Sequence, residues 1–338
     1  MRALFAASLG AVLFGAQLPA ITQPETRRSI GGLPAHIAAA FEQIAACHLS
    51  SSGDFLVFDR RAHAVFSVPA GADSPKKIVD IGEETGRILR PSAFDSAPGG
   101  TFLVADAPGD LRRIQFFSEA GGSQGGFTLA GRGAQGITVG DLVIAGVGSI
   151  EFTGTSLLIA QPEIGALVTE YGLTGETIRT FGDLRSTGQE KDREVHLALN
   201  TVLALVNPKG GYFVVFVSGV PMFRKYDAAG RVLFERHIEG PAIDEYIRQL
   251  PTTWVPRRRA AGEHPIVPAS IRAAAVDHDG NLWVSLIAPY TYVYDGTGEK
   301  ARTIQFRGAG VVAPSGFFFT KDRRVLVSPG CYAFASAL

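Results

Sequence analysis

The chain has 338 residues, of which 46% are hydrophobic, so it can bury a sizeable core. Its 32 Lys and Arg residues balance its 32 Asp and Glu residues, which argues against a uniformly basic surface for nucleic acid or anionic membranes. Glycine (40 residues) and phenylalanine (22 residues) are abundant and long helical patterns are few, which favours many strands joined by tight turns.

The first 20 residues have the pattern of a secretory signal peptide. Arg2 precedes an apolar run from Ala3 to Phe14, and Leu18-Pro19-Ala20 offers a small residue at a cleavage point. The run is too short for a membrane span, which needs about 20 residues; an uncleaved anchor or a buried helix is the alternative. We therefore expect a leader at residues 1–20 and a soluble mature protein that is periplasmic or secreted.

A unit of strands and turns recurs six times in the rest of the chain. Its clearest copy runs from Phe94 to Phe117 and reads as a strand, a Pro-Gly-Gly turn, a second strand, a polar loop and a third strand. The second strands of the units start at Phe55, Phe102, Leu157, Tyr212, Leu282 and Val325. A period of several tens of residues with several strands per unit is typical of propeller blades.

Third and fourth strands follow the second strands, but the sixth unit stops before its fourth. Third strands are predicted at Ala64–Val68, Arg113–Phe117, Ala166–Tyr171, Met222–Tyr226 and Thr291–Tyr294, and fourth strands at Lys77–Gly82, Gly126–Gly131, Thr177–Gly182, Val232–Gly240 and Ala301–Gly308. Thr26–Gly31 resembles the ending Ile178–Gly182, so we expect it to complete the last sheet and remove an open edge. A disordered N-terminal tail is the alternative.

The predicted fold is therefore all-β: residues 21–338 form one six-bladed β-propeller of four-stranded antiparallel sheets, closed by an N-terminal strand in the last blade. An insertion at residues 241–268 separates the fourth and fifth units. Pro241 suits the first position of a helix, and Pro251 ends it. An Ala-rich stretch between Leu33 and Phe41 suggests another short helix, whereas Thr187–Glu194 predicts a polar loop.

The two cysteines, Cys47 and Cys331, lie near opposite ends of the mature region. In an oxidising compartment they could form a disulfide. Two buried free thiols, which behave as small hydrophobic side chains, are the alternative. The sequence leaves both open because it carries no information on the distance between the two residues.

Two motifs suggest ligands but have simpler explanations. Gly131–Gly136 spells G-x-G-x-x-G, yet the strand-like residues that follow, Ile137–Ile150, are not the helix that a dinucleotide site needs, so we interpret it as a link between blades. Asp277-His278-Asp279 precedes Asn281 in a tight turn, which favours a turn over a metal site. None of the seven histidines has the spacing of a zinc motif, and we assign no metal ligand.

The repeat unit resembles a known family. Pro91, Asp95, Gly100, Phe102, Val104, Asp106, Arg113, Ile114 and Phe117 follow P-x-x-x-D…G-x-x-L/F-x-V-x-D…R-I-x-x-F, the pattern of the NHL repeat and its six-bladed relatives, including TolB-like and SMP-30-like propellers. The segment from Ala275 to Val284 is similar to a hairpin common to NHL, SMP-30-like and virginiamycin-lyase-like propellers. The resemblance implies a six-bladed ring with a central channel, but no particular function.

Among these relatives, the SMP-30-like lactonases hold a divalent cation in the channel with acidic and asparagine side chains. This chain has three asparagines, Asn200, Asn207 and Asn281, and the family's ligands cannot be matched onto it residue by residue.

In a propeller, the loops between second and third strands share one face with the links between blades, and here these connections are long. Long loops on a rigid scaffold usually carry binding sites. The candidate ligand-binding residues on this face are Arg61, His63, Asp106, Arg112, Glu163, His196, Trp254, Arg258 and Tyr290. An ordinary solvated surface is the alternative for each of them.

These observations favour an exported binding or interaction module that presents this face to a protein or a small polar ligand. The alternative is a metal-assisted hydrolase of the SMP-30-like lactonase type, and only that alternative requires a cofactor, a divalent cation. No catalytic residue is assigned. We expect a monomer with no nucleic-acid partner and no membrane span. Three or more carboxylate or imidazole groups converging on one point of the channel would favour the hydrolase.

Overall fold

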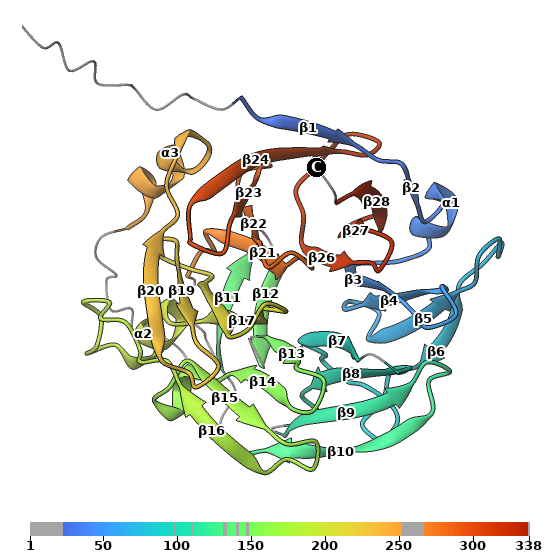
Figure 1. Cartoon of the computed structure of the whole chain (residues 1–338). Coiled ribbons are helices and arrows are strands. Elements are labelled where there is room, and N and C mark those ends of the chain that lie inside the picture. Colours follow the sequence, from blue (N-terminus) through green and yellow to red (C-terminus); the bar gives the residue numbers. More distant parts are fainter. Residues whose placement is uncertain are drawn as a thin grey trace, which may run out of the picture.

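The computed structural model of the chain describes residues 23–97, 99–109, 111–130, 134–139, 142–146, 149–251 and 267–336. In these residues six sheets, each built on four antiparallel strands, stand around a common axis (Figure 1). The predicted six-bladed propeller is therefore confirmed.

The first three blades follow one another along the chain, and within each blade the strands lie side by side in sequence order. Blade one contains β3 (Ile44–Leu49), β4 (Phe55–Asp59), β5 (Ala64–Val68) and β6 (Lys76–Val79). Blade two contains β7 (Ala93–Ala97), β8 (Thr101–Asp106), β9 (Arg112–Ser118) and β10 (Ser123–Leu129). Blade three contains β13 (Ile150–Phe152), β14 (Leu157–Ala160), β15 (Val168–Tyr171) and β16 (Thr177–Phe181).

The last three blades continue the same pattern. Blade four contains β17 (Val202–Val206), β18 (Tyr212–Phe216), β19 (Met222–Tyr226) and β20 (Val232–His237). Blade five contains β21 (Ile271–Val276), β22 (Leu282–Leu286), β23 (Thr291–Tyr294) and β24 (Lys300–Arg307), with β25 (Val311–Val312) paired to β24. Blade six contains β26 (Gly316–Phe319), β27 (Arg324–Ser328) and β28 (Tyr332–Ala335).

The second strand of each blade is mostly apolar and buried because the neighbouring blades cover both of its faces. In β22, for example, all five residues from Leu282 to Leu286 are buried. The aromatic side chains fill the space between blades: Phe213 and Phe223 of blade four pack in one cluster with Leu282 and Tyr292 of blade five. The core is therefore a series of blade-to-blade interfaces around the ring.

A glycine in the turn between the third and fourth strands allows neighbouring blades to approach closely. Gly230 has φ +79°, and a Cβ there would lie 2.9 Å from the side chain of Phe181 in the preceding blade. Gly298 repeats this arrangement one blade later, with φ +86° and 2.6 Å to Phe234. Both the left-handed backbone and the contact require a residue without a side chain.

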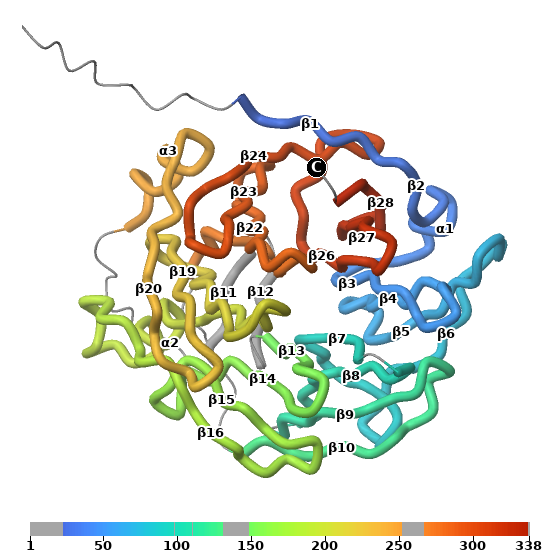
Figure 2. The backbone as a smooth tube through the Cα atoms, viewed as in Figure 1, coloured from blue at the N-terminus to red at the C-terminus, as the bar shows by residue number. Residues whose placement is uncertain are grey.

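The N-terminal segment closes the ring, but it divides between two blades. β2 (Gly31–Gly32) pairs with β28 as the fourth strand of the last blade, which confirms closure by an N-terminal strand. β1 (Glu25–Arg28), in contrast, lies parallel to β24 on the outside of blade five (Figure 2). Most of the predicted closing segment, Thr26–Gly31, therefore joins blade five or crosses between blades. A Cβ at Gly32 would lie 2.2 Å from the carbonyl oxygen of Cys331, so this crossing needs glycine.

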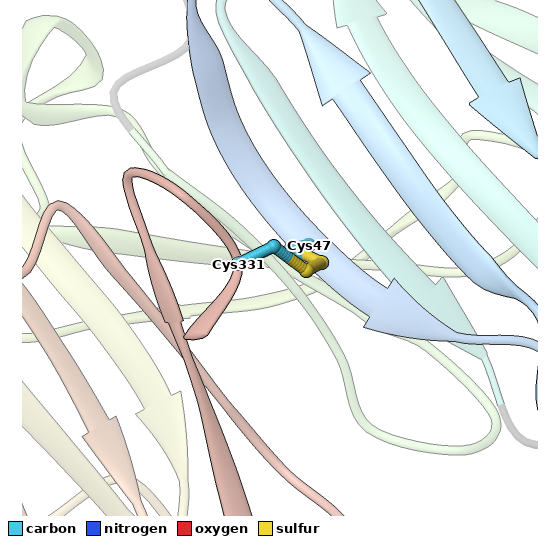
Figure 3. The surroundings of a disulfide bond; sticks show 2 residues. All are labelled: Cys47 and Cys331. Carbon is cyan, nitrogen blue, oxygen red and sulfur yellow. A yellow bond between two sulfur atoms is a disulfide. The ribbon is translucent and has the colours of Figure 1, made fainter. Parts of the chain in front are cut away.

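A disulfide joins the two cysteines, so they are not free thiols (Figure 3). Cys47 lies in β3 of blade one, and Cys331 lies between β27 and β28 of blade six. Their Cα atoms are 5.7 Å apart, although 284 residues separate them in sequence. The bond therefore crosses the seam at which the first and last blades meet.

The helices lie in connections between strands. α1 (Ala35–Ala38) and α3 (Pro241–Gln249) occur where the sequence predicts them. α2 (Arg193–Leu199) was not predicted: the sequence indicated a polar loop up to Glu194. Asp192 begins this helix by accepting a hydrogen bond from the Val195 amide at 3.2 Å.

Two further elements occupy connections around blade three. η1 (Pro162–Ile164) is a short 3₁₀ helix between its second and third strands. β11 (Ala134–Val139) and β12 (Leu142–Gly146) pair as a hairpin in the link from blade two, and β11 also contacts α2. The G-x-G-x-x-G motif therefore runs into a strand; its residues 131–133 lie outside the described residues. The leader also lies outside them, and none of the helices described here has the length and apolar character to cross a membrane.

Candidate functional site

Three connections on one face of blade four enclose a cleft. They are the link from blade three (residues 182–201, with α2), the loop 217–221 and the link that begins with α3, and the strand order places all three at the same ends of the strands. The cleft has two adjoining parts of about 710 and 520 Å³. Its larger part is lined by Leu184, Arg185, Ser186, Thr187, Leu199, Gly219, Val220, Met222, Arg224, Glu235, His237, Ile247, Leu250 and Pro251.

The helix α3 forms one wall and is anchored in the core. The amide of Gly240 donates to the Asp244 carboxylate at 2.8 Å, which holds the start of the helix. Ile243 is fully buried among residues of blades four and five, and the Tyr246 hydroxyl donates to the carbonyl of Ala269 at 2.9 Å. The exposed side of α3 leaves Ile247 in the cleft.

The opposite wall is the link that carries α2, and hydrogen bonds of Asn200 hold this link in its conformation. The Arg185 amide donates to Asn200 Oδ1 at 2.8 Å, and Asn200 Nδ2 donates to the carbonyls of His196 and Arg185 at 3.0 and 3.2 Å. Below this link, Leu199 packs in one cluster with Val217 and Ala269, which come from the other two connections. The walls of the cleft are thus parts of one packed unit.

Arg185 ties two of these connections together, its own link and the loop 217–221. Its guanidinium donates to the carbonyl oxygens of Leu199 at 2.7 Å, Ser218 at 2.5 Å and Val220 at 2.8 Å. It also lies over the Phe216 ring at 4.4 Å from the ring centroid, a cation–π distance. All of these partners are uncharged, so no carboxylate bonds to this cation in the described contacts.

A second arginine on the wall is neutralised by a carboxylate. Arg224 Nε donates to Glu235 at 2.7 Å, and Arg224 Nη1 donates to the carbonyl of Asp183 at 2.6 Å. Burial, together with the charge of Arg224, lowers the pKa of Arg185 to about 10, which keeps Arg185 charged at neutral pH. Among the described residues that line the larger part of the cleft, Arg185 is therefore a cation without a carboxylate partner, and it lies beside apolar walls.

Polar side chains also lie on the inner strands around the axis. His48 Nδ1 and the Ser96 hydroxyl are 2.7 Å apart, which links blades one and two. Asp95 accepts from the Phe152 amide of blade three at 2.7 Å. In the same way, Glu151 accepts from an amide of blade four, that of Val206, at 3.4 Å. Each of these side chains crosses to a neighbouring inner strand.

The two carboxyl groups at the axis share an environment that disfavours charge. Burial raises the pKa of Asp95 to about 7. Burial and the nearby charge of Asp95 raise the pKa of Glu151 well above its usual range. Burial lowers the pKa of His48 to about 3, so its ring is neutral. In the part of the chain that the structure describes, no three His, Cys, Asp or Glu side chains are close enough to hold a metal ion.

Three of the predicted site residues make buried ion pairs. Arg112 and Glu163 meet at 2.6 Å and join blades two and three. Asp106 pairs with Arg113 at 2.6 Å and accepts from the Leu89 amide at 2.9 Å. These interactions hold connections of the predicted face in place.

The other predicted residues are spread over the same face. Arg61 is exposed, His63 Nδ1 accepts from the Arg90 amide at 3.5 Å, and His196 Nδ1 lies 2.7 Å from the Thr187 hydroxyl. Tyr290 packs against the core shared by blades four and five. Trp254 and Arg258 lie outside the described residues.

None of the predicted residues that the structure describes lines the cleft. Arg185, Val220 and Ile247 come from three separate connections, and no motif connects them in sequence. The turn at Asp277 is confirmed, because its carboxylate accepts from the amides of Asp279 and Asn281 at 3.0 and 2.9 Å. The predicted residues lie on the same face as the cleft, whereas the cleft itself depends on how three connections pack.

No family model matches the chain, and no curated protein matches it in sequence. Among solved structures, a streptogramin B lyase is 14% identical, with a TM-score of 0.52 over 85% of this chain and 76% of that one. Virginiamycin B lyase from Staphylococcus aureus, solved with quinupristin, is 9% identical, with a TM-score of 0.50 over 91% and 88%. A chain of the mitotic checkpoint complex is 11% identical, with a TM-score of 0.51 over 99% and 98%. Such low identities show a shared propeller fold alone.

Proposed function

We propose that this protein is an exported β-propeller binding module that takes its ligand in the cleft over blade four. The observation that carries the proposal is the cleft itself, in which three connections of the loop-rich face meet on a rigid scaffold. Its volume of about 710 Å³ falls within the range of about 300–1,000 Å³ that is usual for ligand sites. Its lining combines apolar walls with a few polar groups, as such sites do.

Two features support export. The first 20 residues have the pattern of a cleavable leader, and Cys47 and Cys331 form a disulfide, which persists in oxidising compartments. Mass spectrometry of the protein isolated from the periplasm or the culture medium tests this part. A mature chain that begins after Ala20 is expected, and a cytoplasmic chain that still begins at Met1 would contradict it.

The hydrolase alternative needs several converging metal ligands. The described residues contain no such group, and the polar side chains on the inner strands are engaged with neighbouring blades. We therefore base the proposal on the cleft and assign no reaction.

A pair of tryptophan substitutions tests the site. Val220 lines the cleft and is 48% exposed, whereas Leu111 occupies the corresponding loop of blade two and is 56% exposed. Small molecules and peptides that raise the melting temperature of the wild-type protein are first selected in a thermal-shift screen. Val220→Trp should weaken their binding at least tenfold by filling the cleft, and Leu111→Trp should leave it unchanged. The reverse result would place the site elsewhere on the face.

A further inference from the structure

We propose that the cleft over blade four selects ligands with a carboxylate on an apolar body, the carboxylate lying beside Arg185. This inference rests on the proposed function and adds the chemical class of the ligand. A free aliphatic acid and the C-terminus of an apolar peptide share this chemistry.

The first step of the argument is the unmatched charge. Arg185 is cationic, largely buried, and bonded to three backbone carbonyl oxygens. The charged groups that act on it are Arg224 and Glu235, which form an ion pair with each other, and their effects on Arg185 oppose each other because their charges are opposite. A cation in a partly dehydrated site attracts an anion more strongly than one in bulk water. An anionic ligand would therefore complete the charge balance of this wall.

The second step concerns Glu190, a carboxylate of the same link as Arg185. Glu190 lies in the link that contains Ser186 and Thr187, but it lines a separate hollow of residues 188–194. It accepts from the Thr187 amide at 2.8 Å, from the Ser186 hydroxyl at 2.9 Å and from the Gly188 amide at 3.1 Å. These donors stabilise its charge, and they lower the pKa of Glu190 to about 2. Glu190 thus has partners of its own within its loop.

The third step concerns the orientation of the ligand in the cleft. Next to Arg185 the cleft continues along Val220, Met222, Ile247 and Leu250, which supply an apolar wall. In the smaller part, Asp244 holds the Gly240 amide at 2.8 Å and Arg248 pairs with Glu245. Arg248, the cation of the smaller part, therefore already has a carboxylate partner. The carboxylate of the ligand should lie at the Arg185 end of the cleft, with the apolar body of the ligand against the apolar wall.

Isothermal titration calorimetry with matched probes tests the inference. The probes are octanoate with octanamide, and N-acetyl-leucyl-leucine with its C-terminal amide. At least one acid should bind at least tenfold more tightly than its amide, and this ratio should shrink as the salt concentration rises. Octanoate binding without peptide binding identifies a free acid as the natural source, and the opposite result identifies a peptide C-terminus.

Two substitutions at one exposed position control for charge. Val220→Asp should weaken binding of the acid at least tenfold, whereas Val220→Lys should keep or strengthen it. Arg185 itself is left unchanged because it holds two connections together, its own link and the loop 217–221. Equal binding of acid and amide, with both blocked by Val220→Trp, would overturn the carboxylate class but leave the cleft as the binding site. Binding of the acids that Val220→Trp does not alter would contradict the cleft as well. If neither acid binds at millimolar concentration, the inference is wrong.

Discussion

The seam between blades six and one and the face of blade four are held in different ways. At the seam, β2 completes the last sheet and the Cys47–Cys331 disulfide joins the two blades covalently. At blade four, hydrogen bonds from Arg185 and Asn200 hold long connections over the ends of the strands. The two regions lie on different sides of the ring (Figure 1). The comparison indicates that covalent closure secures the ring where the chain ends meet, whereas polar contacts shape the cleft.

The largest expected effect is at the seam. Replacement of both cysteines, Cys47→Ser with Cys331→Ser, removes a cross-link between residues 284 apart in sequence. Such a loss typically costs about 2–5 kcal/mol of unfolding free energy, because the unfolded chain regains its freedom. The melting temperature of the double variant should fall clearly below that of the oxidised wild type and match that of the reduced wild type. An unchanged melting temperature would show that β2 alone is sufficient to hold the seam.

A smaller effect is expected at blade four. Arg185→Leu leaves the carbonyls of Leu199, Ser218 and Val220 without their donor, at a cost of about 2–4 kcal/mol in total. Arg193→Leu is the matched control, because this exposed arginine of the same link donates to one carbonyl, that of Glu163, at 3.2 Å. Chemical denaturation measures both variants. Equal stability of the two would mean that Arg185 does not hold the connections.

The smallest effect on stability is expected at the axis, apart from both of these regions. The raised pKa of Glu151 means that its folded-state carboxyl keeps its proton at a pH where the unfolded state has lost it. Its contribution to stability is therefore present at acidic pH and is lost as the pH rises above the usual range of glutamate. Glu151→Gln should remove this loss, so that the melting temperature of the variant exceeds that of the wild type by roughly 2–4 °C at pH 8.

The control for this experiment is Glu299→Gln, which changes an exposed carboxylate in blade five. Thermal melts from pH 4 to pH 8 compare the three proteins. The advantage of Glu151→Gln should grow with pH, and the control should follow the wild type. A constant difference between Glu151→Gln and the wild type would refute proton uptake at the axis.

The sequence predicted the fold well because each blade repeats one local pattern. The second strands β4, β14, β18 and β22 begin at the predicted residues, and β8 and β27 begin one residue earlier. A buried strand between turn residues is recognisable without knowledge of its neighbours. The third strands β5, β19 and β23 also have their predicted bounds for this reason.

The remaining features depend on contacts that the sequence pattern does not contain. α2 has seven residues, and its buried residues Val195, Leu197, Ala198 and Leu199 are too few to show a helical period. The charged residues of β1 would suit the outer edge of blade five or of blade six, so the sequence does not decide between them. The structure shows β1 at blade five, where Glu25 pairs with Arg302 at 2.5 Å. Asp95 and Glu151 lie on different blades, and each resembles an ordinary polar residue of its own repeat.

The pairing of β2 with β28 has a consequence for the order of events during synthesis. β2 is synthesised before all six blades, whereas its partner Tyr332–Ala335 follows the other five blades in the sequence. The bond partner of Cys47 emerges equally late. A nascent chain that has not yet reached Cys331 therefore lacks both contacts that close the ring, the β2–β28 pairing and the disulfide. β2 can join its sheet only after the hairpin of β27 and β28 has been synthesised.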